Sequence, residues 1–282
     1  MIKIADSHND FIIEITGRER DCYLFCCQNA GVEIISSAVF TTSRKLNIND
    51  IKKYADEIDL LNKKFNVRLL LSIEDLGFIQ ENELSDLIHL KPFSCTLTWN
   101  NKNKLAGGAK DNGGITAFGK KVINLLEENN IFVDTAHLNR QSFYEFAKMT
   151  NKPIFNSHSN IYKLRHHKRN LTDKQIELIV KSDGYLGLTI YDEFISKAKV
   201  VDEKTVALQF DYLIKKFGHR NFGLGTDFYG IDNTNLPKDI KGYDDISKIS
   251  NELINLGYNS EIIECLIGKN FENFLKRNHI LK

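Results

Sequence analysis

The sequence lacks an excess of charge of either sign. Its 282 residues include 38 Lys and Arg against 37 Asp and Glu, so the chain has no net field that would hold nucleic acid or an anionic membrane surface. No apolar run reaches the roughly 18 residues of a membrane-spanning helix, and MIKIADSHND leaves no room for the apolar region of a signal peptide. We predict a cytoplasmic protein that binds neither nucleic acid nor membrane and takes a small neutral or zwitterionic ligand.

Proline and paired cysteines are also scarce. Three prolines occur, and no Gly/Ser-rich or low-complexity stretch divides the chain, so we find no linker and predict a single domain over residues 1–282. The five cysteines show no C-x-x-C spacing, which argues against a structural zinc site. We expect reduced thiols, three of them on a helix in DCYLFCCQNAG that ends at Gly31.

Short β-prone runs alternate with longer amphipathic segments. The eight runs are IKIADSH, VEIISSAVFT, VRLLLSIE, FSCTLTW, IFVDTAH, PIFNSH, YLGLTIY and FGLGTDF. Between them, residues 49–65 place apolar side chains on one helical face, and Thr172 with Gln175 has the spacing of a capping box. This α/β alternation favours a single (β/α)8 TIM-like barrel, because most runs end in polar or aromatic residues suited to a barrel mouth. A doubly wound open sheet is the alternative.

Residues of metal-binding types recur at the ends of these runs. His8 and Asp10 end the first run and, by the alternation of a strand, point to the same side. Glu74 ends an apolar run, where a buried carboxylate needs a partner, and His137 and His158 end two further runs. Each residue alone has an ordinary explanation as a loop or core residue. Five at comparable positions predict a metal site at the C-terminal ends of the strands.

The number of donors favours two ions. Three imidazoles and two carboxylates exceed what one tetrahedral zinc with an open position needs, and a carboxylate can bridge two ions roughly 3.5–4 Å apart. We therefore expect a dinuclear site. Nitrogen and oxygen ligands without cysteine suit Zn²⁺, while Mn²⁺, Fe²⁺ and Co²⁺ stay open.

Seven motifs in order resemble the renal or membrane dipeptidase family of binuclear zinc peptidases, over nearly the whole chain. They are DSHND (6–10), SIE (72–74), LTWNNKN (97–103), VDTAH (133–137), NSHSN (156–160), RNLTD (169–173) and GLGTDFYG (223–230). The resemblance implies a TIM-like barrel that hydrolyses dipeptides, including ones with a D-configured or dehydro C-terminal residue.

The same resemblance assigns metal ligands. It implies that His8 and Asp10 bind one ion and that Glu74 bridges to the other. His137 and His158 then complete the second ion. A metal-bridged water would be the nucleophile, with its pKa lowered and the scissile carbonyl polarised by the ions.

Substrate contacts are implied in the same way. Asp227 matches an acidic residue that handles protons and faces the substrate's amino group. Arg169 matches the arginine that receives the free carboxylate, a task suited to its bidentate fork. Tyr191 matches an aromatic residue of the pocket. The sequence alone leaves an ordinary explanation open for each of the three. Asp227 would then be a loop carboxylate that caps the next element, Arg169 part of a solvated basic loop, and Tyr191 a core aromatic residue.

Two positions depart from the family pattern. Trp99 stands where the animal enzymes have a histidine that steadies the tetrahedral intermediate, and its indole N–H can donate but cannot be charged. Tyr229 stands where an aspartate is common, which implies a reshaped pocket with the metals untouched. The chain is also shorter than many relatives, so we expect trimmed lid or dimer loops, and a homodimer stays open.

The leading prediction is a metallodipeptidase whose partner is a small dipeptide. An amidohydrolase-like barrel acting on another amide or ester is one alternative. The other is a peptide-binding relative without turnover, whose mark would be the loss of a metal ligand.

Overall fold

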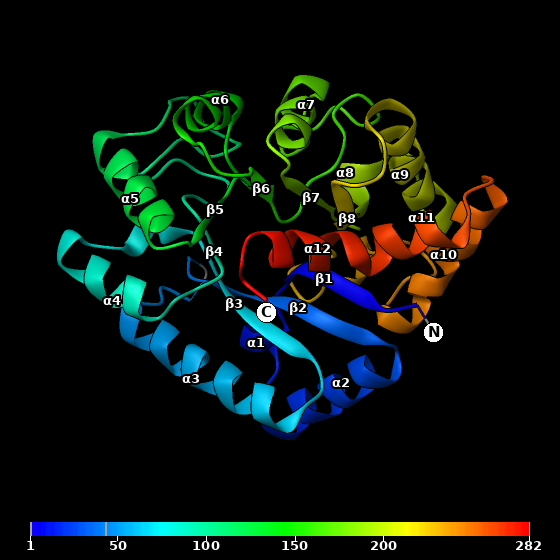
Figure 1. Cartoon of the computed structure of the whole chain (residues 1–282), viewed down its shortest axis with the longest axis horizontal. Coiled ribbons are helices and arrows are strands. Elements are labelled where there is room, and N and C mark those ends of the chain that lie inside the picture. The colour runs from blue at the N-terminus through cyan, green and yellow to red at the C-terminus, as the bar shows by residue number, and fades with distance from the viewer. Residues whose placement is uncertain (1, 43, 282) are drawn as a thin grey trace.

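Eight parallel strands close into a barrel in chain order, with β1 hydrogen-bonded to both β2 and β8 (Figure 1). The computed structural model describes residues 2–42 and 44–281. The strands are β1 Ile4–Asn9, β2 Val32–Phe40, β3 Arg68–Glu74, β4 Ser94–Thr96, β5 Phe132–Asp134, β6 Phe155–Asn156, β7 Tyr185–Leu188 and β8 Phe222–Leu224. The closed sheet confirms the predicted TIM-like barrel, and the alternative prediction of a doubly wound open sheet is wrong.

Helices surround the strands, as Figure 1 shows. The α-helices are α1 Phe11–Glu14, α2 Gly17–Asn29, α3 Ile48–Lys64, α4 Leu84–His89, α5 Ala117–Glu128, α6 Arg140–Met149, α7 Asp173–Lys181, α8 Asp192–Ile195, α9 Glu203–Phe217, α10 Ile246–Asn255, α11 Ser260–Glu264 and α12 Asn270–Arg277. Single turns are η1 Leu76–Phe78, η2 Glu81–Glu83, η3 Asn233–Asn235, η4 Tyr243–Asp245 and the π-helical η5 Cys265–Lys269. In the part of the chain that the structure describes, no helix is long and apolar enough to span a membrane.

Local sequence sets where the helices begin. The predicted capping box of α7 is present, because the Gln175 Oε1 accepts a hydrogen bond from the Thr172 backbone N–H at 3.0 Å. Helix α3 begins at a second capping box, formed by Asn47 and Asp50. Such caps satisfy N–H groups that the first helical turn leaves without partners.

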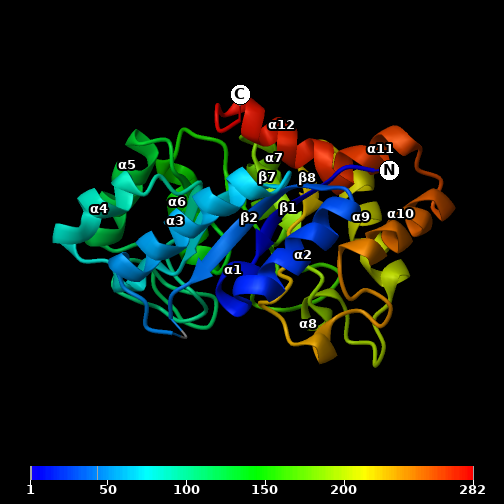
Figure 2. The ribbon, with the colours of Figure 1, turned by 90° about the horizontal axis from the view of Figure 1, so that it is seen from below.

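One end of the barrel is plugged by aromatic side chains. Phe271, Phe274 and Leu275 of α12 are buried in one cluster with inward-facing residues near the strand starts, among them Phe132 and Phe155. Figure 2 shows α12 at this end of the molecule and α1 and α8 at the opposite end. The apolar plug leaves the opposite end, where the strands finish, as the mouth for polar chemistry.

Several strands end earlier than the sequence patterns predict. The runs through His137 and Asp227 leave the β-ladder at Asp134 and Leu224. Both residues adopt left-handed backbone conformations, with φ of 67° for His137 and 64° for Asp227. Such a conformation costs free energy for a residue other than glycine and is concentrated at functional sites. Here the His137 Nε2 lies 2.7 Å from the Glu74 Oε1, and the Asp227 Oδ1 lies 3.7 Å from the His8 Nε2.

Candidate metal centre

The five predicted metal ligands meet at the barrel mouth, together with Asp227. Their donor atoms form three overlapping groups, each with all atoms within 4.8 Å of one another: His8, Asp10 and Glu74; Glu74, His137 and His158; and His8, His158 and Asp227. Five of the six residues are buried. Mixed imidazole and carboxylate donors at this spacing suit a divalent transition-metal ion.

Glu74 lies between two of these groups. Its Oε1 is 2.7 Å from the His137 Nε2 and 3.7 Å from the His158 Nε2. Its Oε2 faces the other way, 4.0 Å from the His8 Nε2. The two oxygens of one carboxylate therefore face different histidines, which is the arrangement that a bridging ligand requires.

Backbone hydrogen bonds between β1 and the segment after β8 place the other carboxylates. The Asp227 N–H donates to the His8 carbonyl at 3.0 Å, and the Asp10 N–H donates to the Phe228 carbonyl at 2.9 Å. The Asp227 Oδ1 consequently lies 3.7 Å from the His8 Nε2. The closure of the barrel thus brings residues from opposite ends of the chain into one site.

The His8 Nε2 and the Asp10 Oδ2 are among the buried side-chain atoms that have no hydrogen-bond partner among the described residues. These two atoms lie 3.3 Å apart. Buried polar atoms are nearly always satisfied, so two orphans facing each other across a cluster of donors fit a site built for a cation.

The histidine rings are oriented by residues that sequence reasoning missed. The Asn100 Oδ1 lies 3.1 Å from the His137 Nδ1, and the Ser157 Oγ lies 2.8 Å from the His158 Nδ1 and 3.3 Å from the His8 Nδ1. In each ring the Nδ1 therefore has a partner outside the ligand cluster, and the Nε2 faces the other ligand candidates. Metal-binding histidines usually have such a partner on the second ring nitrogen, and the positions of Asn100 in LTWNN and Ser157 in NSHSN were the available signal.

Burial and neighbouring charges set the protonation of these side chains. Burial lowers the pKa of His8, but the facing carboxylates, Asp10 first, outweigh it and raise the pKa to about 10. Burial raises the pKa of Glu74, but the contact with His137 and the charges of His8 and Arg169 outweigh it and lower the pKa to about 2. Burial also lowers the pKa of His137 to about 4 and that of His158 well below its usual value. The low pKa values of His137, His158 and Glu74 give the protonation states that a metal ion needs. His8, in contrast, must lose its proton when an ion binds.

A pocket of about 570 Å³ opens over these ligands, and Trp99, Arg169, Tyr191 and Asp227 all line it. Arg169 is buried, and its Nη2 donates to the His158 carbonyl at 3.3 Å. Its Nε has no partner among the described residues. Burial lowers the pKa of Arg169 to about 10, which leaves the guanidinium charged at neutral pH. The structure therefore brings every predicted substrate-binding residue to the same cavity as the metal-ligand candidates.

A family model described as membrane dipeptidase, peptidase family M19, matches residues 29–279. The chain belongs to this family. Peptidase family M19 comprises metallodipeptidases, so the recognition of this hydrolase family from its motifs is confirmed.

Relatives of this M19 chain share its sequence only moderately. An uncharacterized protein of Klebsiella pneumoniae from the pqqA 5′ region is 29% identical over 190 residues, which cover 63% of this chain and 69% of that protein. An uncharacterized dipeptidase of Schizosaccharomyces pombe is 30% identical over 200 residues, covering 66% of this chain and 46% of its own length. The chain thus spans about half of the yeast protein.

A solved structure has the same fold as this M19 chain. The metallopeptidase of Rhodobacter sphaeroides, liganded with a phosphinate mimic of the dipeptide L-Ala-D-Ala, superposes with a TM-score of 0.84. The match covers 98% of this chain and 99% of that one at 18% identity.

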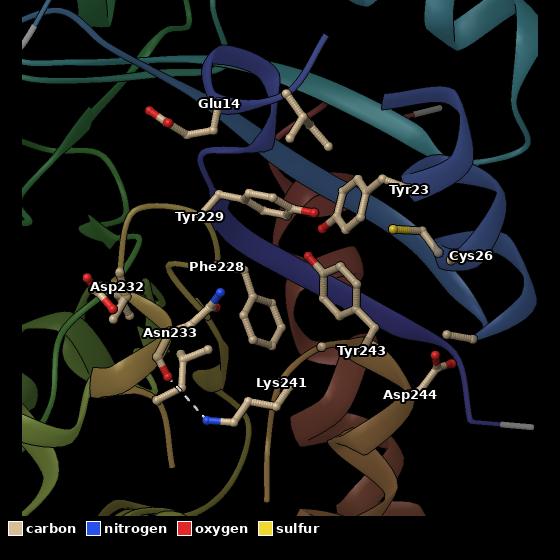
Figure 3. Close-up of a pocket in the computed structure, with 16 residues that line it drawn as sticks. Glu14, Tyr23, Cys26, Phe228, Tyr229, Asp232, Asn233, Lys241, Tyr243 and Asp244 are labelled. Carbon is tan, nitrogen blue, oxygen red and sulfur yellow. Dashed lines mark hydrogen bonds between the residues drawn. The ribbon is translucent and has the colours of Figure 1, made fainter. Parts of the chain in front are cut away.

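The two departures from the family pattern lie in different places. Trp99 is in the candidate active-site pocket, with its ring 5.2 Å from that of Phe40 and 6.1 Å from that of His137. Tyr229 lines a neighbouring cavity on the outer side of the segment after β8 (Figure 3). The Tyr229 ring packs edge-on against Tyr23 at 5.0 Å. Tyr229 therefore does not line the candidate active-site pocket, and it could reshape that pocket only indirectly.

Proposed function

We propose that this M19 chain is a dipeptidase that hydrolyses the peptide bond of dipeptides with free termini. In this proposal the ligands of two divalent ions, with Zn²⁺ the best fit to the donor set, are His8, Asp10, Glu74, His137 and His158. Bound there, the ions would supply an activated water and polarise the scissile carbonyl.

The observation that carries the proposal is the position of Glu74. One carboxylate with its oxygens turned to different histidines, at the ends of parallel strands, lies under a pocket of about 570 Å³. This volume lies within the range of roughly 300–1,000 Å³ typical of small-molecule sites. A dipeptide fits such a pocket, whereas a folded protein substrate does not.

Charged residues in the pocket suit the two ends of a dipeptide. Arg169 stays charged at neutral pH. Its Nη2 donates to the His158 carbonyl, whereas its Nε has no partner among the described residues, so the guanidinium keeps N–H groups for the terminal carboxylate. Asp227 lies on the other side of the ligand cluster, beside His8. Burial raises the pKa of Asp227 well above its usual value, which favours the protonated carboxyl group that a proton donor to the departing amine requires.

We further propose that the C-terminal residue of the substrate is accepted in the D configuration. The support is the Rhodobacter sphaeroides metallopeptidase of the same fold, which is liganded with a mimic of L-Ala-D-Ala. Trp99 lines this pocket at the position where the resemblance implies a histidine, so in this proposal oxyanion stabilisation from this position would rely on a neutral indole N–H.

A substrate panel tests the proposal. Purified protein supplied with Zn²⁺ should hydrolyse L-Ala-L-Ala or L-Ala-D-Ala, and acetylation of the amine or amidation of the carboxylate should abolish turnover. Chelator should remove the activity and Zn²⁺ should restore it. Turnover of N-acyl amino acids or lactones in place of dipeptides would reject the dipeptidase assignment in favour of another amide or ester hydrolase.

The domain organisation, the cellular location and the oligomeric state are also proposals. We propose that residues 1–282 form one domain, since α12 packs against β1, β7 and β8 and so ties the end of the chain to its start. The cytoplasmic location and a homodimer stay predictions.

A further inference from the structure

Asn9 is fully buried between the two proposed ligands His8 and Asp10, and its side chain uses all of its hydrogen-bonding groups. Its Nδ2 donates to the hydroxyl of Tyr23 and to that of Tyr243, both at 2.9 Å. Its Oδ1 accepts from the Phe11 backbone N–H at 2.9 Å. This last contact identifies the oxygen of the amide, because a backbone N–H can only donate. Asn9 is therefore held in a single orientation.

Tyr243 extends these contacts to the strand that closes the barrel. Its hydroxyl accepts from Asn9 and donates to the Asp6 Oδ2 at 2.6 Å. The Asp6 Oδ1 accepts from the backbone N–H of Thr226 at 2.8 Å and from that of His8 at 3.2 Å. A continuous buried network thus joins η4, β1 and the residue before Asp227.

The tyrosines come from elements that do not contribute metal-ligand candidates. Tyr23 lies in α2 and Tyr243 in η4, and Figure 3 shows their hydroxyl ends pointing toward each other and toward that of Tyr229. They line a cavity of about 620 Å³ that adjoins the pocket over the ligands at Ile231 and Asp232, and neither tyrosine lines that pocket. Hydrogen bonds connect the two hydroxyls to the metal-ligand candidates through Asn9 and Asp6.

We propose that Tyr23 and Tyr243 are positioning residues for the metal centre. Their hydroxyls hold Asn9, and Asn9 fixes the backbone that carries His8 and Asp10 at the spacing the ions need. Removing one hydroxyl leaves a buried amide hydrogen without a partner, which the chain relieves by shifting this backbone. The inference rests on the proposed metal site, because positioning has no meaning without ions to bind.

The test substitutes Tyr243→Phe and, separately, Tyr23→Phe, which remove one oxygen and keep the ring. Tyr258→Phe is the matched control, since the Tyr258 hydroxyl donates to the Asp211 carboxylate at 2.8 Å on the outside of the barrel. Cobalt binding is followed by visible absorption and by competition with a chelator of known affinity. Loss of an outer partner of a metal ligand typically weakens binding about 10- to 100-fold. The tyrosines contact Asn9 and not a ligand, so we expect a loss of about 10-fold and an altered cobalt spectrum for the first two variants and neither for the control.

Kinetics and a double substitution separate positioning from general destabilisation. With saturating metal, kcat should fall in both variants while KM stays near that of the wild type, because the substrate does not touch either tyrosine. The hydrogen bond that joins the Tyr23 hydroxyl to this network is the one from Asn9. If it carries the effect, Tyr23→Phe should have no additional effect on cobalt affinity when combined with Asn9→Ala.

Distinct results would overturn this inference and the underlying function. If the wild type binds cobalt and both tyrosine variants match it in affinity and spectrum, or lose no more than Tyr258→Phe, the positioning role is wrong while the metal site stands. A wild type that binds no cobalt would reject the proposed metal site and the positioning role together.

Discussion

Replacing Glu74 with Gln removes one charge from the centre of the site and keeps the shape of the side chain. In the native protein the two oxygens lie 2.7 Å from the His137 Nε2 and 4.0 Å from the His8 Nε2, on opposite sides of the carboxylate. The amide nitrogen of Gln has no lone pair to offer a metal, so one side loses its ligand. Two unit charges about 4 Å apart attract by about 4 kcal/mol at an effective dielectric constant of 20. Affinity for the ions should therefore fall by roughly a thousandfold.

The measurement is equilibrium dialysis against buffered Zn²⁺ at a series of free concentrations, followed by elemental analysis. Glu128→Gln on α5 is the control, because it makes the same chemical change at an exposed position. We expect about two ions per chain for the wild type and the control, and for Glu74→Gln a large shift to higher free Zn²⁺ together with lost turnover. A Glu74→Gln variant that binds both ions with unchanged affinity would refute the bridging assignment.

Three further predictions concern the substrate pocket, the thiols and the core. Arg169→Lys keeps the charge but loses the fork, so KM for a dipeptide should rise about 10- to 100-fold. Binding of a dipeptide amide, measured by competitive inhibition, should not change, and equal losses for both ligands would argue against carboxylate binding. Burial raises the pKa of Cys27 to about 12, so this thiol stays protonated from pH 7 to 9. Iodoacetamide should therefore label the exposed Cys22 but should not label Cys27 until the protein unfolds, and mass spectrometry measures this difference. Phe271→Ala in the aromatic plug should lower the free energy of unfolding, measured by denaturant titration, by about 3–5 kcal/mol. Phe25→Ala at an exposed site on α2 should change it by less than about 0.5 kcal/mol. Similar losses for both variants would contradict the stabilising role of the aromatic plug.

The strand order was predictable because buried parallel strands read as apolar runs. VRLLLSIE corresponds to β3 and ends at Glu74 as expected. The ends of later strands were not predictable, because His137 and Asp227 take left-handed conformations without being glycine. Tertiary contacts at the mouth impose these turns, and no local pattern encodes them.

The sequence likewise predicted which residues are ligand candidates, but it did not predict where their individual donor atoms point. Their clustering followed from strand ends meeting at one mouth, whereas the direction of each Glu74 oxygen depends on side-chain packing across the barrel. The bond between Asn9 and Tyr243 joins positions 234 residues apart. Such a contact exists only once η4 packs against β1, so the sequence carried no periodic signal for it.

Metal content and dipeptide hydrolysis, measured on the same sample during a Zn²⁺ titration of chelator-treated protein, test the central claim most directly. We predict that hydrolysis is absent from the metal-free protein, rises with bound Zn²⁺ and saturates at about two ions per chain. Full activity in protein shown to contain no metal, or a fully loaded protein that cleaves no dipeptide with free termini, would contradict it.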